Sequence, residues 1–360
     1  MEKGYLVLET GEVFEGIRIG SQTNSLGEVV FNTSMTGYQE MMTDPSYTGQ
    51  ILTFCYPLIG NYGINLVDNE SKKPTLAGVI IGNACEEPSH YQSVQSLSEQ
   101  LVQVGVPGLT GVDTRALTKA IRKQGTVKGY LSAEEAPQPQ IFQEKEKEFW
   151  VGQVSTKAVK KYLGRGPHVV LIDYGYKKSI LKALQHAGCA VTVIPYSYSF
   201  QQVQSLQPDG VVFSNGPGDP MALEKWFPEI KKITQTYPSL GICLGHQLIA
   251  LAYGAKTEKM KYGHRGGNHP VKEIKTGKVH MTPQNHSYVV TVASIKTSEF
   301  EVTYRNINDQ TIEGLKHKKY PIESVQFHPE AHPGPSDTAH VFQQFIDQIS
   351  SVGEFQYAIT

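Results

Sequence analysis

The chain has 360 residues, with 33 lysines and arginines against 34 aspartates and glutamates, and a formal net charge of −1 at pH 7. This length allows two domains with cores of their own, and the even charge without a basic cluster argues against nucleic-acid binding. No apolar run approaches the roughly 20 residues that span a bilayer, and the four cysteines are far apart, so we expect a cytoplasmic enzyme with reduced thiols and no metal.

Residues 1 to about 130 predict a mixed α/β domain rich in β-structure. The first nine residues are strand-like and broken by acids, without the apolar core of a signal peptide. Strands are predicted at 4–8, 13–19, 28–32 and 50–54, the first two as a hairpin, and a helix follows Asp113 or Thr114 as its cap. The polar segment 33–47 is rich in Gly, Pro, Ser and Thr, which predicts a surface connection.

The stretch 132–167 is polar and charged, which predicts a connection between domains that is helical in part. Its charged run at 144–148 is interpreted as a solvated face. We therefore expect an N-terminal domain at 1–150, with the connecting segment beginning at 132, and a C-terminal domain at 168–355.

From His168 onward, apolar strands alternate with helices, which predicts an α/β fold with a mostly parallel sheet covered on both faces. The expected strands lie at 168–173, 190–195, 210–213 and 239–242, with helices at 177–187, 200–206, 223–237 and from 244. The tail returns to strands, at 279–281, 287–292, 301–304 and from 322, and closes with a helix near 337–349. Sites in such sheets form at the carboxyl ends of strands, which is where the 214–220 loop and Cys243 are expected, on adjacent strands.

Cys243 stands between Gly241 and Gly245 at a predicted strand-to-helix turn. This is a Gly-x-nucleophile-x-Gly elbow with sulfur in place of oxygen. The turn would place the sulfur at a helix N-terminus, where the dipole favours the reactive thiolate. A lone cysteine in an apolar sequence is more often inert core, but glycines on both flanks favour a nucleophile.

His328 and Glu330 are two residues apart at the end of the predicted strand that begins at 322, a spacing that points both side chains to one face. The histidine can act as the base for Cys243 while the carboxylate orients its ring. His-Pro-Glu alone is a weak signal, and its weight comes from occurring together with the cysteine elbow.

The motif Gly-Ile-Cys-Leu-Gly-His-Gln at 241–247 together with His-Pro-Glu at 328–330 resembles the class I glutamine amidotransferases. That resemblance implies a flavodoxin-like glutaminase domain with a Cys-His-Glu triad. Further motifs, spread over nearly the whole chain, resemble the small subunits of carbamoyl-phosphate synthases. They are Thr-Gly-Tyr-Gln-Glu at 36–40, Asp-Pro-Ser-Tyr at 44–47, Gly-Leu-Thr-Gly-Val-Asp-Thr-Arg at 108–115, Asn-Gly-Pro-Gly-Asp-Pro at 215–220 and Gly-Gly-Asn-His-Pro at 266–270.

The resemblance implies that Cys243 is the nucleophile, His328 the base and Glu330 its orienter. It also implies a set of glutamine-binding residues: Ser46, Gly216, Gly218, Leu244, Gln247, Asn285, Ser287 and Tyr288. The N–H groups of Leu244 and of the Gly216 loop would hold the oxyanion. Serine at 287 departs from the glycine expected there, which makes its contact the least secure. His264, His269 and His286 are expected to support the site or the fold.

The resemblance further implies a heterodimer, and it leaves a higher assembly of heterodimers open. The partner would be a large subunit that uses ATP, Mg²⁺ and bicarbonate to make carbamoyl phosphate for arginine or pyrimidine synthesis. No cofactor is expected on this chain, which has no phosphate-loop motif. Two alternatives remain open: the glutaminase component of another amidotransferase, such as one of anthranilate or GMP synthesis, and a catalytically silent regulatory subunit.

Overall fold

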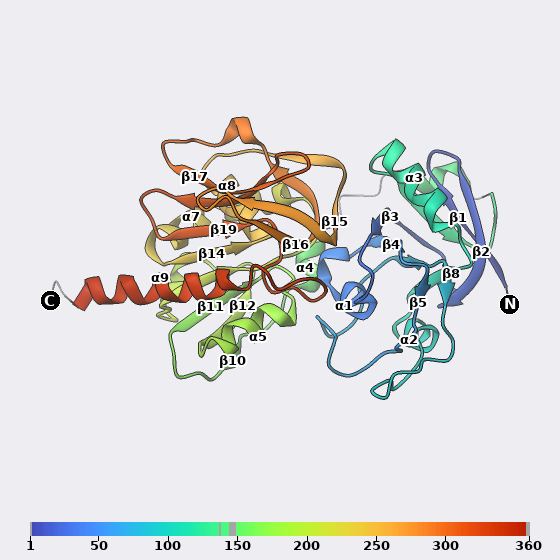
Figure 1. Ribbon diagram of the computed structural model, residues 1–360, viewed down its shortest axis with the longest axis horizontal. Helices are drawn as coiled ribbons and strands as arrows, with labels where there is room; N and C mark the ends of the chain where they lie inside the picture. Colours follow the sequence, from blue (N-terminus) through green and yellow to red (C-terminus); the bar gives the residue numbers. More distant parts are fainter. Residues whose placement is uncertain (1, 137, 144–148, 358–360) are drawn as a thin grey trace. The chain divides into compact units, whose positions relative to one another are not determined.

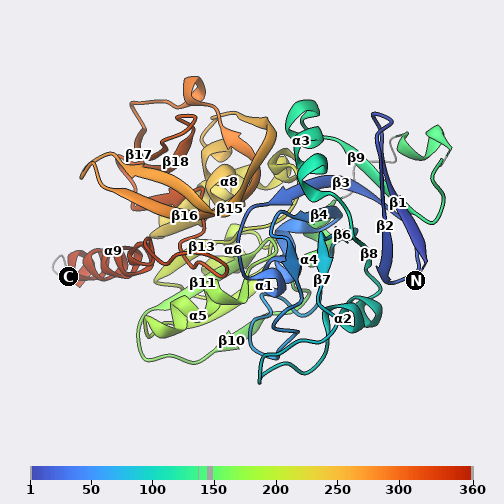
Figure 2. The same cartoon turned by 45° about the vertical axis from the view of Figure 1, so that its right-hand side comes forward.

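The computed structural model describes residues 2–136, 138–143 and 149–357 (Figures 1 and 2). The chain divides into two compact units, Met1–Glu148 and Phe149–Thr360. The charged run predicted as a solvated face, at 144–148, lies outside the described residues. Among the described residues, no helix combines the length and the apolar character that a membrane crossing requires.

The first unit is built on a closed β-barrel, in the order β1-β2-β8-β6-β4-β3-β9. The predicted hairpin is confirmed, with Leu6 opposite Phe14. The strands of the barrel are β1 (Lys3–Leu8), β2 (Val13–Gly20), β3 (Ser25–Asn32), β4 (Gln50–Phe54), β6 (Gly78–Ile80), β8 (Pro107–Thr110) and β9 (Lys128–Ser132). A separate two-stranded sheet consists of β5 (Leu58–Ile59) and β7 (Asn83–Ala84). Its α-helices are α1 (Tyr38–Thr43), α2 (Leu97–Val104) and α3 (Thr114–Gln124), the last capped by the Asp113 side chain.

The polar segment 33–47 lies at the surface only in its first four residues, so the prediction is wrong for the larger part from Gly37 onward. It contains α1 and a 3₁₀ turn, and the side chains of Tyr38 and Tyr47 are only 1 % exposed. The hydroxyl of Tyr38 donates a hydrogen bond to the carbonyl of Gly63 (2.6 Å), and Asn32 Nδ2 donates to the Tyr47 hydroxyl (2.8 Å). Tyrosine can be buried when its hydroxyl finds a partner, and composition alone does not reveal such partners.

The second unit contains a sheet of ten strands in its described part, in the order β10-β12-β11-β13-β14-β19-β18-β17-β15-β16. The strands β12, β11, β13, β14 and β19 run parallel, and the others pair antiparallel. The bounds are β10 (Lys160–Tyr162), β11 (His168–Asp173), β12 (Ala190–Pro195), β13 (Gly210–Phe213), β14 (Ser239–Ile242), β15 (Thr257–Glu273), β16 (Val279–Val290), β17 (Phe300–Asn306), β18 (Ile312–His317) and β19 (Ile322–Val325).

Helices cover both faces of this sheet, as the strand–helix alternation predicts. One core contains apolar side chains of α5 and α9, and the other contains side chains of α6, α7 and α8 (Figure 1). The helices are α4 (Trp150–Val154), α5 (Lys178–His186), α6 (Phe200–Gln204), α7 (Phe227–Thr236), α8 (Leu244–Ala252) and α9 (His340–Tyr357). Because the five parallel strands run in one direction, their carboxyl ends lie at the same edge of the sheet. At that edge β13 and β14 are neighbours.

Three strands of this unit escaped the sequence prediction: β10, β15 and β18. β10 lies inside the segment predicted as a connection and pairs with β12. β15 is long and contains the Gly-Gly-Asn-His-Pro motif, and it pairs with β16 so that His264 lies opposite His286. Glycine and polar residues are depleted in strands, and long-range pairing overrides that weak local preference here.

Candidate active site

Cys243 occupies the tight turn between β14 and α8, as predicted. Its φ of +53° is rare for a residue with a side chain, and such strain is characteristic of functional turns. Gly245 is required by a close approach, because a Cβ there would lie 2.1 Å from the carbonyl oxygen of Phe213 on β13. The thiol itself is only 2 % exposed.

His328 and Glu330 meet, but not by the route expected from their spacing. β19 ends at Val325, so both residues lie beyond the strand and the alternation argument is wrong. The His328 N–H donates to the carbonyl of Pro283 (3.0 Å), and the Ala331 N–H donates to the carbonyl of His328 (3.2 Å), which closes a turn. This turn brings His328 Nδ1 to 2.6 Å from Glu330 Oε1.

The charges around His328 determine its protonation. Burial by itself would lower its pKa, but the negative charges of Glu330 and Cys243 outweigh burial and raise the pKa to about 10. His328 is therefore cationic at neutral pH. Its Nε2 is buried and has no hydrogen bond of normal geometry among the described residues.

Lys177 is a residue of this site that the sequence reasoning missed. Its ammonium lies 3.1 Å from Glu330 Oε1 and donates to the carbonyl of Ala331 at 2.5 Å, with the side chain almost fully buried. Burial would raise the pKa of Glu330, but Lys177 first and then His328 lower it to about 2. Lys177 lies shortly after the carboxyl end of β11, and residues at such positions line the crevice of an open α/β sheet. This position in the sequence is the signal by which Lys177 could have been predicted.

Replacing Lys177 with methionine should destabilise the second unit markedly. The change leaves the fully buried Glu330 without its main counter-charge, and breaking a buried pair in this way costs about 3–5 kcal/mol. The lowered pKa of Glu330 stabilises the folded protein. This stabilisation is fully present above pH 4.5, the pKa of the carboxyl group in the unfolded chain, and it is lost as the pH falls through about 2, the pKa in the folded protein. The measurement is urea unfolding at pH 7, followed by fluorescence.

Lys178→Met is the matched control, because the neighbouring Lys178 side chain is exposed and should lose little stability when it is replaced. Equal midpoints for the two variants would contradict the role assigned to Lys177.

Gln326 lies next to the thiol, and Gln247 is hydrogen-bonded to Gln326. Gln326 Nε2 points at Cys243 Sγ from 3.6 Å, and Cys243 Sγ lies 3.6 Å from the carbonyl oxygen of Asn285. Gln247 Nε2, one helical turn beyond Cys243, donates to the carbonyl of Tyr288 (2.8 Å) and to Gln326 Oε1 (3.0 Å). Gln326 was not predicted, because only its neighbours in the His-Pro-Glu segment form a motif.

Of the other predicted glutamine-binding residues of this unit, Gly216 lies next to the start of α8. A Cβ on Gly216 would lie 2.9 Å from the Leu244 side chain and 2.4 Å from the carbonyl of Tyr174, so the 214–220 loop runs close to the start of α8. Gly218 has a φ of +89°. The Ser287 hydroxyl accepts a hydrogen bond from Arg265, so its side chain already has a partner.

Ser46 belongs to the first unit, in the 3₁₀ turn Pro45–Tyr47, where its N–H donates to Asp44 Oδ1 (2.9 Å). Its proposed contact with glutamine stays a prediction.

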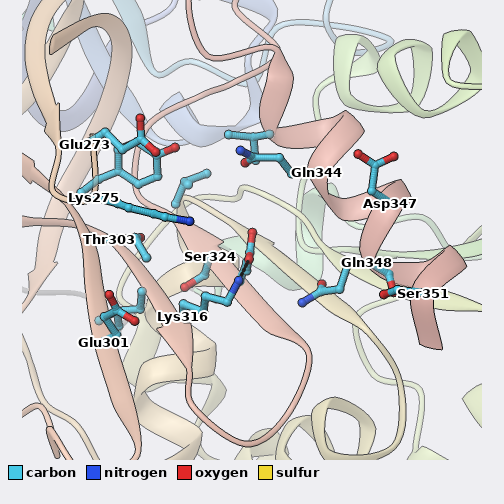
Figure 3. A pocket seen from close by; sticks show the side chains of 15 residues that line it. Glu273, Lys275, Glu301, Thr303, Lys316, Ser324, Gln344, Asp347, Gln348 and Ser351 are labelled. Carbon is cyan, nitrogen blue, oxygen red and sulfur yellow. Dashed lines mark hydrogen bonds and ion pairs between the residues drawn. The ribbon is translucent and has the colours of Figure 1, made fainter. Parts of the chain in front are cut away.

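A hollow of about 740 Å³ lies between the strands β15, β17, β18 and β19 and the helix α9. Figure 3 shows Gln344, Asp347, Gln348 and Ser351 on the helix, across from Glu273, Lys275, Thr303 and Lys316. Its lining includes none of Cys243, His328 and Glu330, so this hollow is separate from the site described above. The side chains that line it carry charges of both signs.

Two family models match the chain. "Glutamine amidotransferase class-I" matches residues 170–348, and "Carbamoyl-phosphate synthase small chain, CPSase domain" matches residues 6–131. The second match accounts for the first unit, which a glutaminase component of another amidotransferase would leave unexplained.

Curated relatives match over nearly the full length. The chain is 52 % identical to a carbamoyl phosphate synthase arginine-specific small chain of Halalkalibacterium halodurans, over 98 % of both chains. It is also 52 % identical to a pyrimidine-specific small chain of Bacillus subtilis, over 97 % of this chain and 96 % of that one. Among solved structures, a putative GMP synthase subunit of Thermoplasma acidophilum covers 54 % of this chain and all of its own, with 24 % identity and a TM-score of 0.47.

Proposed function

The chain belongs to the family of carbamoyl phosphate synthase small chains, and from that premise we propose that it hydrolyses L-glutamine to glutamate and ammonia through Cys243, His328 and Glu330. One observation carries the proposal: a strained cysteine elbow shares a buried site with a histidine that is 2.6 Å from a carboxylate. A thiolate beside an imidazolium is the reactive form of a catalytic cysteine.

In the first half of the reaction, the Cys243 thiolate attacks the amide carbon of glutamine. The C–N bond breaks as His328 gives its proton to the departing ammonia. A γ-glutamyl thioester on Cys243 and a neutral His328 remain.

In the second half, a water molecule gives a proton to His328 and attacks the thioester carbon. The C–S bond breaks, glutamate leaves, and the thiolate and imidazolium are restored. Glu330 keeps the ring of His328 oriented and stabilises its positive charge in both halves.

The start of α8 supports a place for the oxyanion. The N–H of Leu244 follows the nucleophile directly, and an N–H of the Gly216 loop is the second donor that we assign. Gly218, Gln247, Asn285, Ser287 and Tyr288 are assigned to glutamine binding, together with Ser46 of the first unit.

The ammonia is assigned to a large subunit, in a heterodimer, that makes carbamoyl phosphate from bicarbonate and ATP with Mg²⁺. The absence of a phosphate-loop motif from the sequence supports an ATP site on the partner. The equal identity to an arginine-specific and a pyrimidine-specific small chain does not favour either pathway. The cytoplasm remains the predicted compartment.

Docking of the large subunit should raise the rate of glutamine hydrolysis. The thiol is nearly inaccessible in the chain alone, and an uncoupled glutaminase would waste glutamine. The experiment measures glutamate release by the purified chain, by the complex with the large subunit, and by the complex with ATP and bicarbonate. Equal rates in all three would end the coupling proposal, and no release in any of them would end the proposed function.

A further inference from the structure

A cluster of charged side chains, two of them buried and the third, Asp309, exposed, stands beside the proposed glutamine site and has no role in the chemistry above. His264 of β15 lies between two carboxylates: its Nε2 is 2.7 Å from Asp309 Oδ2, and its Nδ1 is 3.6 Å from Glu313 Oε1. Glu313 is 0 % exposed, and His264 is also buried. We call His264, Asp309 and Glu313 the ion cluster.

The charges in this cluster depend on one another. A fully buried carboxylate is costly without a cation nearby. Burial would lower the pKa of His264, but its hydrogen bonds with Asp309 and then Glu313 raise it to about 9. Burial would raise the pKa of Asp309, yet His264 keeps it at about 2. At neutral pH the cluster therefore contains a cationic histidine and an ionised Asp309.

The cluster fixes the side chain of Gln284 on β16. Gln284 Nε2 donates to Glu313 Oε2 (2.9 Å), which settles the orientation of the amide, and Oε1 then faces His286 Nε2 at 2.8 Å. The other ring nitrogen of His286 lies 2.9 Å from the carbonyl oxygen of Tyr288, but the neutral ring has a single N–H, which it can donate to only one of these two oxygens. The carboxyl group of Glu313 thus fixes Gln284, and Gln284 in turn faces His286, two residues further along β16.

Further hydrogen bonds run from residue 288 of the same strand to the thiol. The same Tyr288 carbonyl accepts from Gln247 Nε2, Gln247 also bonds Gln326, and Gln326 Nε2 points at Cys243 Sγ. The antiparallel register places Arg265 opposite Asn285, next to the pair His264 and His286. Every residue named here between the ion cluster and Cys243 is buried or partly buried.

We propose that the ion cluster is a positioning unit: through Gln284 and His286 it holds residues 285–288 of β16 in the geometry that binds glutamine. This inference rests on the proposed function, because it deepens the role of the same pocket. The cluster touches neither the substrate nor the reacting atoms. Its loss should therefore weaken glutamine binding far more than it slows the chemical steps.

The variant that tests the proposal is His264→Gln combined with Glu313→Gln. His264→Gln alone would leave a buried carboxylate without its cation and could unfold the protein, whereas the double change removes both charges of the pair. We expect glutamine affinity to fall about tenfold or more, a size typical of coupling through a packed network. In the chain with Cys243 intact, KM for glutamine should rise by a similar factor while kcat stays within about threefold.

His280→Gln is the matched control. His280 is a buried histidine on the same strand, β16, and its Nε2 has no hydrogen-bond partner among the described residues. It lies 3.8 Å from a carboxylate oxygen of Glu273, so the control also removes a histidine that has an acidic neighbour. Its substitution should leave glutamine binding within about twofold of the parent chain, as is usual away from a coupled network.

Binding is measured by calorimetry on the full chain carrying Cys243→Ser, which cannot turn glutamine over. Weaker binding in the double variant, at an unchanged unfolding midpoint and with a normal His280→Gln control, supports the positioning unit. Equal binding in the double variant overturns the inference and leaves the proposed function standing. Absence of glutamine binding in the Cys243→Ser chain with an intact cluster overturns both.

The pH dependence provides a readout that a purely structural role would not move. The stability that His264 gains from its raised pKa is fully present below the unfolded pKa near 6.5, and both this stability and the charge of the ring are lost as the pH rises through about 9. The groups that face His264 are Asp309, Glu313, and the histidines 269 and 286, whose pKa values burial and the charge of His264 lower. Between pH 8 and 10, glutamine affinity should therefore fall more steeply in the parent chain than in the double variant, which has no His264 to lose its charge. An equal fall in both proteins would contradict the proposal.

Discussion

Replacing Cys243 with serine should abolish glutamine hydrolysis, with a loss of about a thousandfold or more, since a hydroxyl is a far poorer nucleophile than a thiolate at neutral pH. The fold should be kept, because the hydroxyl fills nearly the same space at the turn. In the complex with the large subunit, synthesis from free ammonia should continue. The measurements are glutamate release and carbamoyl phosphate formation from glutamine and from ammonia.

Cys189→Ser is the control for loss of a buried thiol in the same unit. Cys189 lies in the apolar core near α5, and burial raises its pKa to about 11, so it stays an inert thiol at neutral pH. This variant should hydrolyse glutamine at close to the parental rate. Substantial turnover by the Cys243 variant would remove that residue from the mechanism.

Replacing His328 with asparagine should cost about a hundredfold to ten-thousandfold in turnover, the range of a lost general acid and base. Ammonia would depart without a proton donor, and water would attack the thioester without a base. The cationic ring would also no longer stand beside the thiolate, so alkylation of Cys243 by iodoacetamide at pH 7 should slow. Both effects are measurable on the purified chain, by glutamate release and by mass spectrometry of the labelled cysteine.

His317→Asn is the matched control for this variant. His317 is a buried histidine of β18 whose Nδ1 accepts from the N–H groups of Lys319 and Tyr320, and an asparagine oxygen can replace that acceptor. Normal turnover by the His328 variant would shift attention to His246 or His286.

Glu330→Gln should slow turnover less than either change above, because Glu330 orients the base without bonding to substrate. The control is the order of the three rates, measured under one condition. A larger loss than that of the Cys243 variant would contradict this ranking.

Local sequence determined the elements that hold the candidate site. The alternation of apolar strands and amphipathic helices from His168 predicted the parallel sheet, and glycines at 241 and 245 predicted the turn at Cys243, which the structure confirms. These features are readable because hydrophobic periodicity and glycine requirements act within a few residues. The motifs spread over the chain predicted the family, which the family models confirm.

Tertiary structure decided which side chains meet. Spacing predicted that His328 and Glu330 would share a strand face, but a turn beyond β19 unites them, with its first N–H bonded to Pro283. Lys177 and Ala331 are 154 residues apart in the chain, and Cys243 and Gln326 are 83 apart, yet each pair is in contact. No local pattern encodes such contacts.

The ion cluster illustrates the same division. The sequence placed His264 and His286 only as supporting residues, and it gave no reason to connect them with Asp309 or Glu313. Pairing of β15 with β16 and of β17 with β18 brings these four side chains together, three of them buried and Asp309 at the surface, and the charge of His264 depends on its two acidic neighbours. The sequence by itself determined the reactive residue types and the strands that present them. Burial and long-range strand pairing decided their partners and their charges, because a pKa is a property of the packed surroundings and not of the residue alone.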